Sequence, residues 1–308
     1  MIRRVAVRTV VLAVMLVSLV PAFGAPQRQF NPPFELPAGV TLQEDIIFSR
    51  PAGHELRLDL FAPEGGDGPR PAIVFILGSG WRGGDKSHFW RHAAHMASLG
   101  FVGICIEHRG SADAAYPAAV DDAKAAVRWL RAHATEYRID PDRIGAAGGS
   151  SGGHLAAFLG VTPEMRSLTP TSEYAEFSAT VRAVAAFNPA MDLEATGATA
   201  QGTAALDAFL GTSYDDNPEL WREASPISHV GTDSAAFLVL HGTNDQVVAY
   251  EQSVAMVDAL KKAGVRAEMF TADGAGHGFF NAPPWYGQTL MMMTAFFLDT
   301  LAADGNSR

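Results

Sequence analysis

Three short segments of the chain carry the residue types that nucleophilic catalysis needs. Two serines lie in the run Gly148-Gly149-Ser150-Ser151-Gly152-Gly153, Asp245 follows one apolar run, and His277 follows another. Residues 142–147 predict a short buried strand before the serines, and residues 155–159 predict the apolar face of a helix after them. A serine hydroxyl needs a base that takes its proton and an acid that orients this base. The three segments therefore predict a catalytic triad in the order Ser, Asp, His.

The serine segment fits the pattern G-x-S-x-G in two registers. Residues 148–152 centre Ser150, and residues 149–153 centre Ser151. Glycines allow the sharp turn that exposes a serine between a strand and a helix. A flexible glycine-serine loop is the alternative for such a motif alone. The predicted strand and helix, and the acid and base downstream, favour the catalytic interpretation.

Asp245 is the favoured acid because it lies in the loop that leaves a predicted buried strand, residues 235–241. In a site with the order Ser, Asp, His, the acid is expected at such a strand end. Asp192 and Asp273 are its rivals. Asp273 lies four residues before His277 on the same connection, which places it behind Asp245 as a candidate.

His277 is the favoured base because it is the only one of the ten histidines that follows Asp245. It stands between two glycines, directly after the last predicted strand. A lone histidine is more often hydrogen-bonded or solvated than catalytic, but the chain order favours catalysis here. We expect His241 to be structural, bonding within its own loop. We expect His154 to cap or pack at the helix that follows the serines.

The first 24 residues have the pattern of a secretory signal peptide. A start with three arginines precedes an apolar run, residues 10–20, and small residues follow at 22–24. A retained membrane anchor is the alternative, which the shortness of the apolar run disfavours. Residues 25–40 are rich in proline and glutamine and predict an extended leader. We therefore expect a secreted or periplasmic protein with no membrane attachment after signal cleavage.

Charge and cysteine content exclude several classes of protein. The formal net charge is −10, and losing the three arginines of the signal peptide takes it to −13. Such an acidic chain is not expected to bind nucleic acid or an anionic membrane surface, whereas an uncharged or cationic substrate is easier to accommodate. Cys105, the only cysteine, lies in an apolar run and predicts an inert core residue.

Strand and helix patterns alternate along most of the chain. Residues 41–48 and 54–61 alternate apolar and polar side chains and predict an antiparallel pair at a sheet edge. The other predicted elements are strands at 72–77, 101–107, 142–147, 181–187, 235–241 and 266–271, and helices at 87–99, 116–137, 250–263 and 285–301. This alternation predicts an α/β fold with a mostly parallel sheet covered by helices on both faces. Residues 191–230 break the pattern and predict an irregular or helical insertion near the site.

Five motifs follow one another in a fixed order. They are Gly80-Trp81 with Gly84-Asp85-Lys86, then Asp140-Pro141-Asp142-Arg143-Ile144, the serine run, and the loops of Asp245 and His277. From about residue 44 to the C-terminus, the chain resembles the α/β-hydrolase superfamily, near its secreted acetyl esterase, feruloyl esterase and acetylxylan esterase group. The resemblance implies an α/β-hydrolase domain at 41–308 with a cap-like insertion at 191–230. It is specific to the superfamily and much less specific to a substrate.

The serine run resembles the Gly-Gly-Ser-Ala-Gly-Gly-His-Leu-Ala segment of these esterases. This implies that Ser150 is the nucleophile and that Ser151 donates its backbone N–H to the oxyanion. The second donor would be the backbone N–H of Ser79 or Gly80. Leu77 departs from the family, which carries a histidine there that helps to hold this loop. The departure predicts a less rigid loop, with lower activity or an unusual substrate.

The resemblance implies a serine carboxylic ester hydrolase that forms an acyl-enzyme on small or carbohydrate-linked acyl esters, of acetyl or feruloyl type. It implies no metal and no organic cofactor. Candidates to line a sugar or aromatic acyl site are Trp81, Trp285, Tyr286 and Trp221, with ordinary packing as the alternative for each. Two other functions stay open. A peptidase of the prolyl oligopeptidase type usually carries a large additional domain, and a non-catalytic binding protein is suggested only by Leu77.

Overall fold

The computed structural model describes residues 34–162, 173–197 and 203–302. Its compact unit spans Glu35–Arg308. The predicted signal peptide and residues 25–33 of the predicted leader lie outside the described residues. Among the helices of the described part, none is long and apolar enough to cross a membrane.

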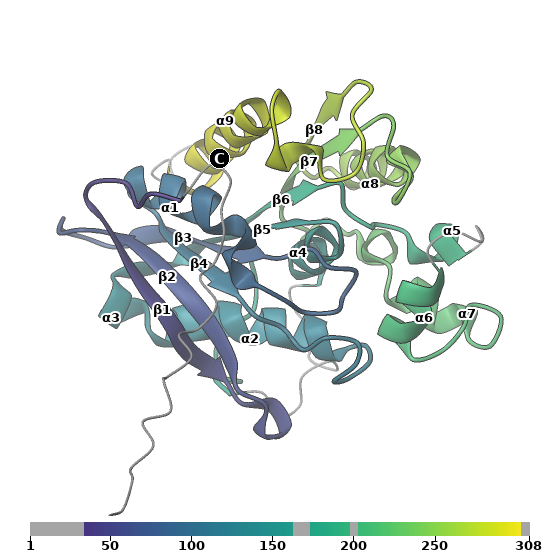
Figure 1. The fold of residues 1–308 in the computed structure, drawn as a ribbon, viewed down its shortest axis with the longest axis horizontal. Coiled ribbons are helices and arrows are strands. Elements are labelled where there is room, and N and C mark those ends of the chain that lie inside the picture. The colour runs from purple at the N-terminus through teal and green to yellow at the C-terminus, as the bar shows by residue number, and fades with distance from the viewer. Residues whose placement is uncertain (1–33, 163–172, 198–202, 303–308) are drawn as a thin grey trace, which may run out of the picture. The chain divides into compact units, whose positions relative to one another are not determined.

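A single sheet of eight strands forms the centre of the fold (Figure 1). The strands are β1 (Val40–Ser49), β2 (Leu56–Pro63), β3 (Arg70–Ile76), β4 (Val102–Ile106), β5 (Ile139–Gly149), β6 (Ala183–Phe187), β7 (Ala236–Gly242) and β8 (Ala267–Ala272). Their order across the sheet is β1-β2-β4-β3-β5-β6-β7-β8. β1 and β2 are antiparallel to their neighbours, and the remaining strands pair in parallel. The mostly parallel α/β sheet predicted from the sequence is confirmed.

The parallel strands are buried on both faces because their side chains are continuously apolar. Every residue of β4 and β6 is buried. In β5 successive side chains face opposite layers. A Cβ added at Gly145 would meet Phe297 and Leu301 near the C-terminus, so Ile144 and Ala146 face the other layer.

Helices cover both faces of this sheet. The longer ones are α1 (Trp90–Ser98), α2 (Ala118–Ala132), α4 (Ser151–Val161), α8 (Tyr250–Lys262) and α9 (Trp285–Phe297). Figure 1 shows α1 and α9 side by side over one face and α2 under the other. His95 of α1 bonds Thr294 of α9 through Nε2 and Oγ1 at 3.1 Å, which ties the two helices of the first layer together.

The segment predicted as an insertion, residues 191–230, contains short helices between β6 and β7. They are α5 (Leu193–Gly197), α6 (Thr203–Leu210), α7 (Pro218–Glu223) and the 3-10 turn η4 (Pro226–His229). Phe209 and Trp221 are 1% and 0% exposed and belong to the core cluster that includes the sheet, so this segment packs into the main core. Of the two alternatives that the sequence left open for Trp221, its burial supports ordinary packing.

The Gly84-Asp85-Lys86 motif is structural. Asp85 caps the 3-10 turn η2 (Lys86–Phe89) by accepting a hydrogen bond from the N–H of Ser87. The Lys86 side chain is 3% exposed, and its ammonium nitrogen lies 2.6 Å from a carboxylate oxygen of Asp45 and 3.4 Å from one of Asp59. This ion network fastens the start of the first helix layer to β1 and β2. Cys105 is fully buried in β4, as expected of a core residue.

His92 of α1 is a buried imidazole in an apolar setting. It is 2% exposed, it packs against Phe280 and Tyr286, and neither ring nitrogen has a hydrogen-bond partner within the described chain. Burial lowers its pKa to about 3, with a smaller contribution from His88 and other cationic groups nearby. The unfolded chain therefore binds a proton below about pH 6.5 that the folded chain does not bind.

We expect His92→Phe to flatten the pH dependence of stability. The free energy of unfolding of the natural chain falls as the pH drops below about 6.5, and each such histidine contributes about 1.4 kcal/mol per pH unit. Urea unfolding at pH 7, 6 and 5 measures the slope for the variant and for the exposed control His54→Phe. An unchanged slope in His92→Phe, with a reduced slope in the control, would contradict the assignment.

Candidate active site

Ser150 stands at the sharp turn between β5 and α4. Its backbone has φ 54° and ψ −123°, a conformation that costs a non-glycine residue of order 1–3 kcal/mol. Its N–H donates to the Phe187 carbonyl at 2.8 Å, which holds the strained turn. A Cβ at Gly148 would lie 2.3 Å from the Gly152 carbonyl oxygen, so these glycines permit the close approach of strand and helix.

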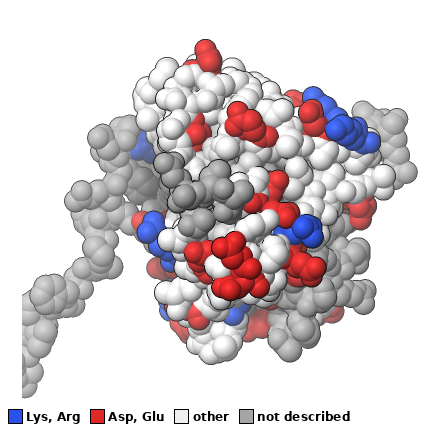
Figure 2. Space-filling view, turned by 90° about the vertical axis from the view of Figure 1, so that its right-hand side faces the viewer, with Lys and Arg blue, Asp and Glu red and all other residues white. Residues whose placement is uncertain are grey.

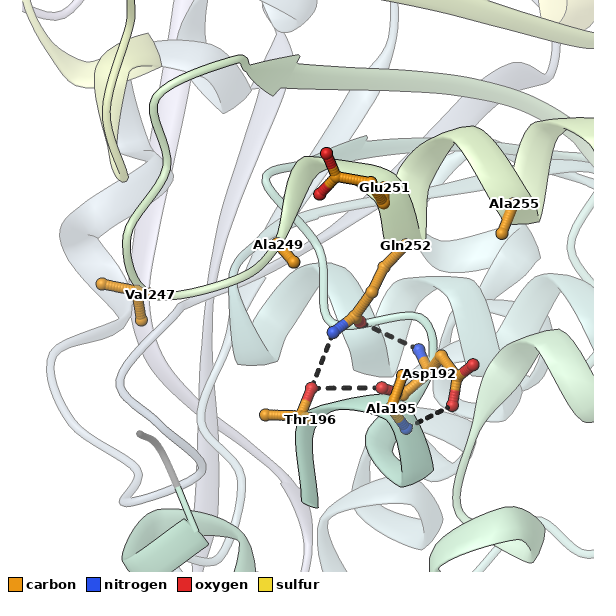
Figure 3. Close-up of a pocket in the computed structure, with 8 residues that line it drawn as sticks. All are labelled: Asp192, Ala195, Thr196, Val247, Ala249, Glu251, Gln252 and Ala255. Atoms are coloured by element: carbon orange, nitrogen blue, oxygen red, sulfur yellow. Dashed lines mark hydrogen bonds between the residues drawn. The ribbon is translucent and has the colours of Figure 1, made fainter. Parts of the chain in front are cut away.

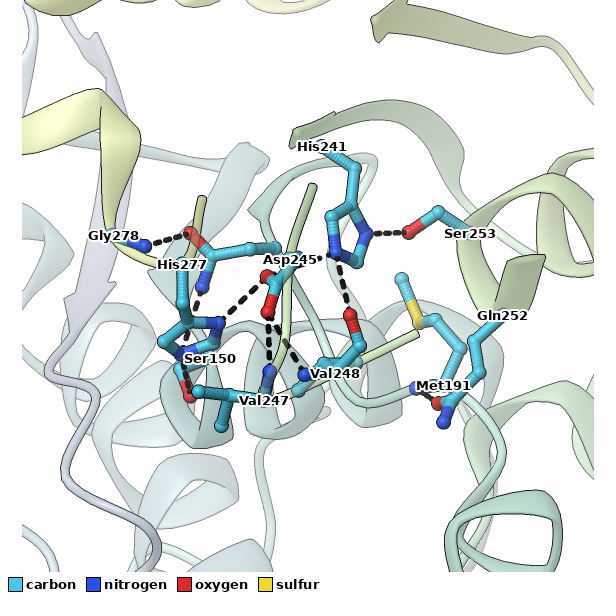
Figure 4. Close-up of polar contacts among 11 residues, drawn as sticks. Ser150, Met191, His241, Asp245, Val247, Val248, Gln252, Ser253, His277 and Gly278 are labelled. Atoms are coloured by element: carbon cyan, nitrogen blue, oxygen red, sulfur yellow. Dashed lines mark hydrogen bonds and ion pairs between the residues drawn. The ribbon is translucent and has the colours of Figure 1, made fainter. Parts of the chain in front are cut away.

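Three side chains form one chain of hydrogen bonds at the carboxyl ends of the strands (Figure 4). The His277 Nε2 atom lies 2.9 Å from the Ser150 Oγ atom, and its Nδ1 atom lies 2.7 Å from Asp245 Oδ2. Because a carboxylate only accepts, Nδ1 carries the hydrogen and Nε2 is left to accept the serine proton. The structure thus brings together Ser150, Asp245 and His277.

Asp245 is a buried carboxylate saturated with donors. Its Oδ1 atom accepts from the N–H groups of Val247 at 2.8 Å and Val248 at 2.9 Å, and its Oδ2 atom faces His277 and His241. Burial raises the pKa of this carboxyl, but hydrogen bonds from His241, His277 and the two backbone groups lower it more. The net pKa lies far below its usual range, so the group is ionised at neutral pH.

The rival acids occupy other places. Asp192 Oδ1 accepts from the N–H of Ala195 at 3.0 Å and begins helix α5. Asp273 Oδ1 accepts from the hydroxyl of Thr243 at 3.1 Å in the turn after β8. Asp245 is the carboxylate whose oxygen meets the ring of His277.

Asn188, at the end of β6, was not predicted from the sequence. Its Oδ1 atom accepts from the N–H of Gly278 at 3.2 Å, and its Nδ2 atom lies 3.4 Å from Nε2 of His277. Its own N–H donates to the Leu240 carbonyl at 2.7 Å. Asn188 therefore steadies the loop of the base. The signal in the sequence was a polar residue directly after a buried strand.

The loop after β3 lies against the nucleophile turn. A Cβ at Gly78 would be 3.2 Å from Cβ of Ser150. The N–H of Ser79 donates to Oγ of Ser151 at 3.0 Å, so it is not free to bind an oxyanion. The N–H groups of Gly80 and Ser151 make no hydrogen bond within the described chain. Of the two alternatives for the second donor, the geometry favours Gly80, with Ser151 as its partner.

The same loop is fastened without the family histidine. Leu77 is 4% exposed and belongs to the core. Trp81 donates its indole N–H to Nδ1 of His154 at 3.1 Å, and His154 donates from Nε2 to the Ala224 carbonyl at 2.8 Å. Burial lowers the pKa of His154 to about 4, although the bond to Ala224 raises it, so the ring stays neutral. As expected, His154 packs at the helix after the serines, and it also links the loop to the insertion.

The aromatic candidates for substrate contact differ in how far their side chains are buried. Trp81 is 6% exposed and stacks on Phe209 with ring centroids 4.8 Å apart. Trp81 therefore anchors the loop after β3 by packing, and the structure favours this role over the substrate contact suggested from the sequence. Trp285 packs edge-on against Phe279, and Tyr286 packs edge-on against His92. Both are half-buried at the start of α9, and their contact with substrate stays a prediction.

We expect Ser151→Ala to lower kcat by about 5- to 10-fold with little change in KM. The hydroxyl that accepts the Ser79 N–H is lost, and one such hydrogen bond contributes about 1 kcal/mol to holding the loop. Ser79→Ala is the matched control, because the Ser79 hydroxyl has no partner within the described chain and its N–H is kept. Steady-state kinetics with a p-nitrophenyl ester measure both variants. Equal losses in the two would contradict this role for Ser151.

A pocket of about 270 Å³ borders the acid loop (Figure 3). It is lined by Asp192, Ala195, Thr196, Val247, Ala249, Glu251, Gln252 and Ala255. Gln252 holds one wall together by accepting from the N–H groups of Met191 and Asp192, each at 3.0 Å. In residues 34–162, 173–197 and 203–302, no cluster of histidine, cysteine, aspartate or glutamate has the arrangement to hold a metal ion.

The strand order, the serine after β5, the acid after β7 and the histidine after β8 define an α/β-hydrolase fold. The profile of the BD-FAE family matches residues 58–260, and the chain belongs to this family of α/β-hydrolase esterases.

Relatives and solved structures agree with this assignment. Esterase LipQ of Mycobacterium tuberculosis is 33% identical over 235 residues, which cover 74% of this chain and 55% of LipQ. A truncated carbohydrate esterase from gut microbiota has a TM-score of 0.74 at 28% identity, covering 85% of this chain and 97% of that one. Propionate-bound Est2, an esterase from Thermogutta terrifontis, has a TM-score of 0.73 at 31% identity, covering 90% of this chain and 100% of Est2. The chain spans about half the length of the curated relatives it matches.

Proposed function

We propose that this protein is a serine carboxylic ester hydrolase that acts through an acyl-enzyme on small or carbohydrate-linked acyl esters. The observation that carries the proposal is the hydrogen-bonded chain from Ser150 through His277 to Asp245. We assign the oxyanion hole to the N–H groups of Gly80 and Ser151, which make no hydrogen bond within the described chain.

The geometry supports a two-step acyl transfer. The Ser150 oxygen attacks the ester carbonyl carbon while Nε2 of His277 takes the hydroxyl proton. The carbonyl oxygen becomes negative and accepts hydrogen bonds from Gly80 and Ser151, a term of about 2.7–4 kcal/mol per donor. The alcohol leaves with the proton from His277. Water, deprotonated by the same nitrogen, then hydrolyses the acyl-enzyme, releases the acid and returns the proton to Ser150.

Asp245 keeps the ring of His277 in one orientation throughout this cycle. Its carboxylate accepts the Nδ1–H of His277 and stabilises the imidazolium that forms in each step. Because donors hold its pKa far below the usual range, it does not take the proton itself. The steps need no cofactor from outside the chain.

Three observations support the substrate class. The solved relatives include a carbohydrate esterase and an esterase with bound propionate, a short acyl group. The pocket beside the acid loop combines small apolar side chains with Asp192 and Glu251. Carboxylates accept hydrogen bonds from sugar hydroxyls and repel anions. The face in Figure 2 also carries more acidic than basic side chains, which favours uncharged or cationic substrates.

Hydrolysis of p-nitrophenyl acetate, butyrate and octanoate, and of acetylated xylo-oligosaccharides, tests the proposal. We expect turnover that falls with acyl length, and release of acetate from the sugar esters. Chromogenic peptide substrates with proline before the scissile bond serve as the comparison. A folded protein that cleaves only the peptides supports a peptidase, and one that cleaves none of them supports the non-catalytic alternative.

We also propose that residues 1–24 are a signal peptide and that the mature protein works outside the cytoplasm. The arginine-rich start, the short apolar run and the small residues at 22–24 support this proposal. N-terminal sequencing of the exported protein is expected to begin near Ala25. A product that keeps residues 1–24 and sediments with the membrane fraction would support a retained anchor.

A further inference from the structure

The carboxylate of Asp245 meets two histidines. Its Oδ2 atom lies 2.7 Å from Nδ1 of His277 and 3.1 Å from Nε2 of His241 (Figure 4). The first contact belongs to the proposed triad. The second has no part in proton transfer, because His241 has no exposed surface to meet a substrate.

The orientation of His241 is fixed on both sides of its ring. Nε2 lies 3.1 Å from Asp245 and 3.2 Å from the carbonyl oxygen of Val248, and Nδ1 lies 2.6 Å from the hydroxyl of Ser253. A carbonyl oxygen only accepts, so Nε2 carries a hydrogen and shares it between Asp245 and Val248. Ser253 is buried in α8, and its hydroxyl is in place to hold the other nitrogen.

We propose that His241 is a positioning residue, which holds the carboxylate of Asp245 in the plane and direction that His277 requires. Ser253 sets the orientation of the His241 ring. This role rests on the proposed function, because it acts on the acid of the proposed triad.

The geometry explains why a further donor is needed. The N–H groups of Val247 and Val248 fix only the Oδ1 atom of Asp245. Rotation of the carboxylate about its Cβ–Cγ bond moves both oxygens together, and the two N–H groups restrain this rotation at Oδ1 alone. His241 and His277 restrain it at Oδ2. A displacement of about 1 Å at a catalytic group lowers rates by as much as about 100-fold.

The lowered pKa of the Asp245 carboxyl also supports a role for His241 at this group. Among the groups that lower the pKa of Asp245, His241 is the strongest, ahead of His277 and the two backbone N–H groups. His241 thus helps to keep the buried carboxylate ionised without taking the place of the base. The sequence suggested that His241 bonds within its own loop; its contacts with Asp245 and Val248 fit this, and Ser253 adds a tie to α8.

Two amide variants separate positioning from packing. In His241→Gln the amide nitrogen occupies the place of Nε2 and still donates to Asp245. In His241→Asn the amide reaches only the place of Nδ1, near Ser253, and the donor to Asp245 is lost. We expect His241→Asn to lower kcat for p-nitrophenyl acetate by about 10- to 100-fold with KM nearly unchanged. We expect His241→Gln to stay within about 5-fold of the natural chain, since one donor is worth about one hydrogen bond.

A double-mutant cycle shows whether His241 acts through Asp245. Labelling by a fluorophosphonate reports attack by the serine, and its rate is measurable even in slow variants. In the Asp245→Asn background we expect His241→Asn to slow labelling by less than about 3-fold, because there is no carboxylate left to orient. The same loss in both backgrounds would overturn the proposal, as would equal kcat values for His241→Asn and the natural chain.

Folding is measured separately for each variant by urea unfolding. If His241→Asn does not fold, Ser253→Ala replaces it, and we expect a loss in kcat of about 3- to 10-fold from one missing hydrogen bond. Unchanged kcat in a folded Ser253→Ala would then overturn the proposal. Absence of ester turnover in the natural chain would instead refute the proposed function, so the two failures are distinguishable.

Discussion

Ser150→Ala is expected to lower kcat for p-nitrophenyl acetate by at least about 10⁴-fold while the protein stays folded. The hydroxyl that lies 2.9 Å from Nε2 of His277 is lost, and no other side chain takes its place at the turn. The residual rate would come from the N–H groups of Gly80 and Ser151 acting on an ester that water attacks. Steady-state kinetics and urea unfolding measure the two quantities.

Ser151→Ala is the informative comparison, because the sequence allows either serine at the centre of its motif. The structure turns the Ser151 hydroxyl toward the N–H of Ser79, and the side chain is 1% exposed. The loss in its alanine variant is therefore limited to the about 5- to 10-fold expected from the Ser79 contact, far less than the loss in Ser150→Ala. The reverse result, with Ser151→Ala inactive and Ser150→Ala active, would mean that the other register holds the nucleophile.

Asp245→Asn is expected to lower kcat by about 10⁴-fold with a small effect on KM. An amide in place of the carboxylate presents either an oxygen without charge or an N–H₂ group to Nδ1 of His277. In the second case the imidazole takes the wrong tautomer and cannot accept the proton of Ser150. Steady-state kinetics with p-nitrophenyl acetate measure the loss.

Asp273→Asn is the matched control, since Asp273 lies on the same connection as His277 but bonds the Thr243 hydroxyl. We expect its kcat within about 3-fold of the natural chain, as for a surface hydrogen bond. A large loss in Asp273→Asn together with a small loss in Asp245→Asn would assign the acid to the rival residue.

The order of strands and helices was predictable because buried strands and amphipathic helices differ in period. Boundaries were less accurate. The helix predicted at 116–137 is divided into α2, which ends at Ala132, and the short α3 (Ala134–Tyr137). The helix predicted at 87–99 begins as a 3-10 turn, because the Asp85 side chain accepts from the N–H of Ser87. Such local hydrogen bonds leave little trace in the period of apolar residues.

The chemistry of the site was predictable where a motif and a strand end coincide, as at Ser150, Asp245 and His277. The contacts of Asn188 and His241 were not, because they depend on which strands lie side by side. β6 pairs with β7, and β7 with β8, so residues far apart in sequence converge at one edge. Trp81 was misjudged for a similar reason. Its φ of 56° and its hydrogen bond to His154 turn the indole inward under the insertion.

In the proposed ester hydrolysis, Ser150 is the nucleophile, and its hydroxyl lies 2.9 Å from Nε2 of His277. Mass spectrometry of this protein after treatment with a fluorophosphonate tests this role of Ser150 most directly. We predict one adduct, located on Ser150 by peptide mapping, and complete loss of ester hydrolysis in step with labelling. An adduct on Ser151, or no adduct on a folded protein, would show that Ser150 is not the nucleophile.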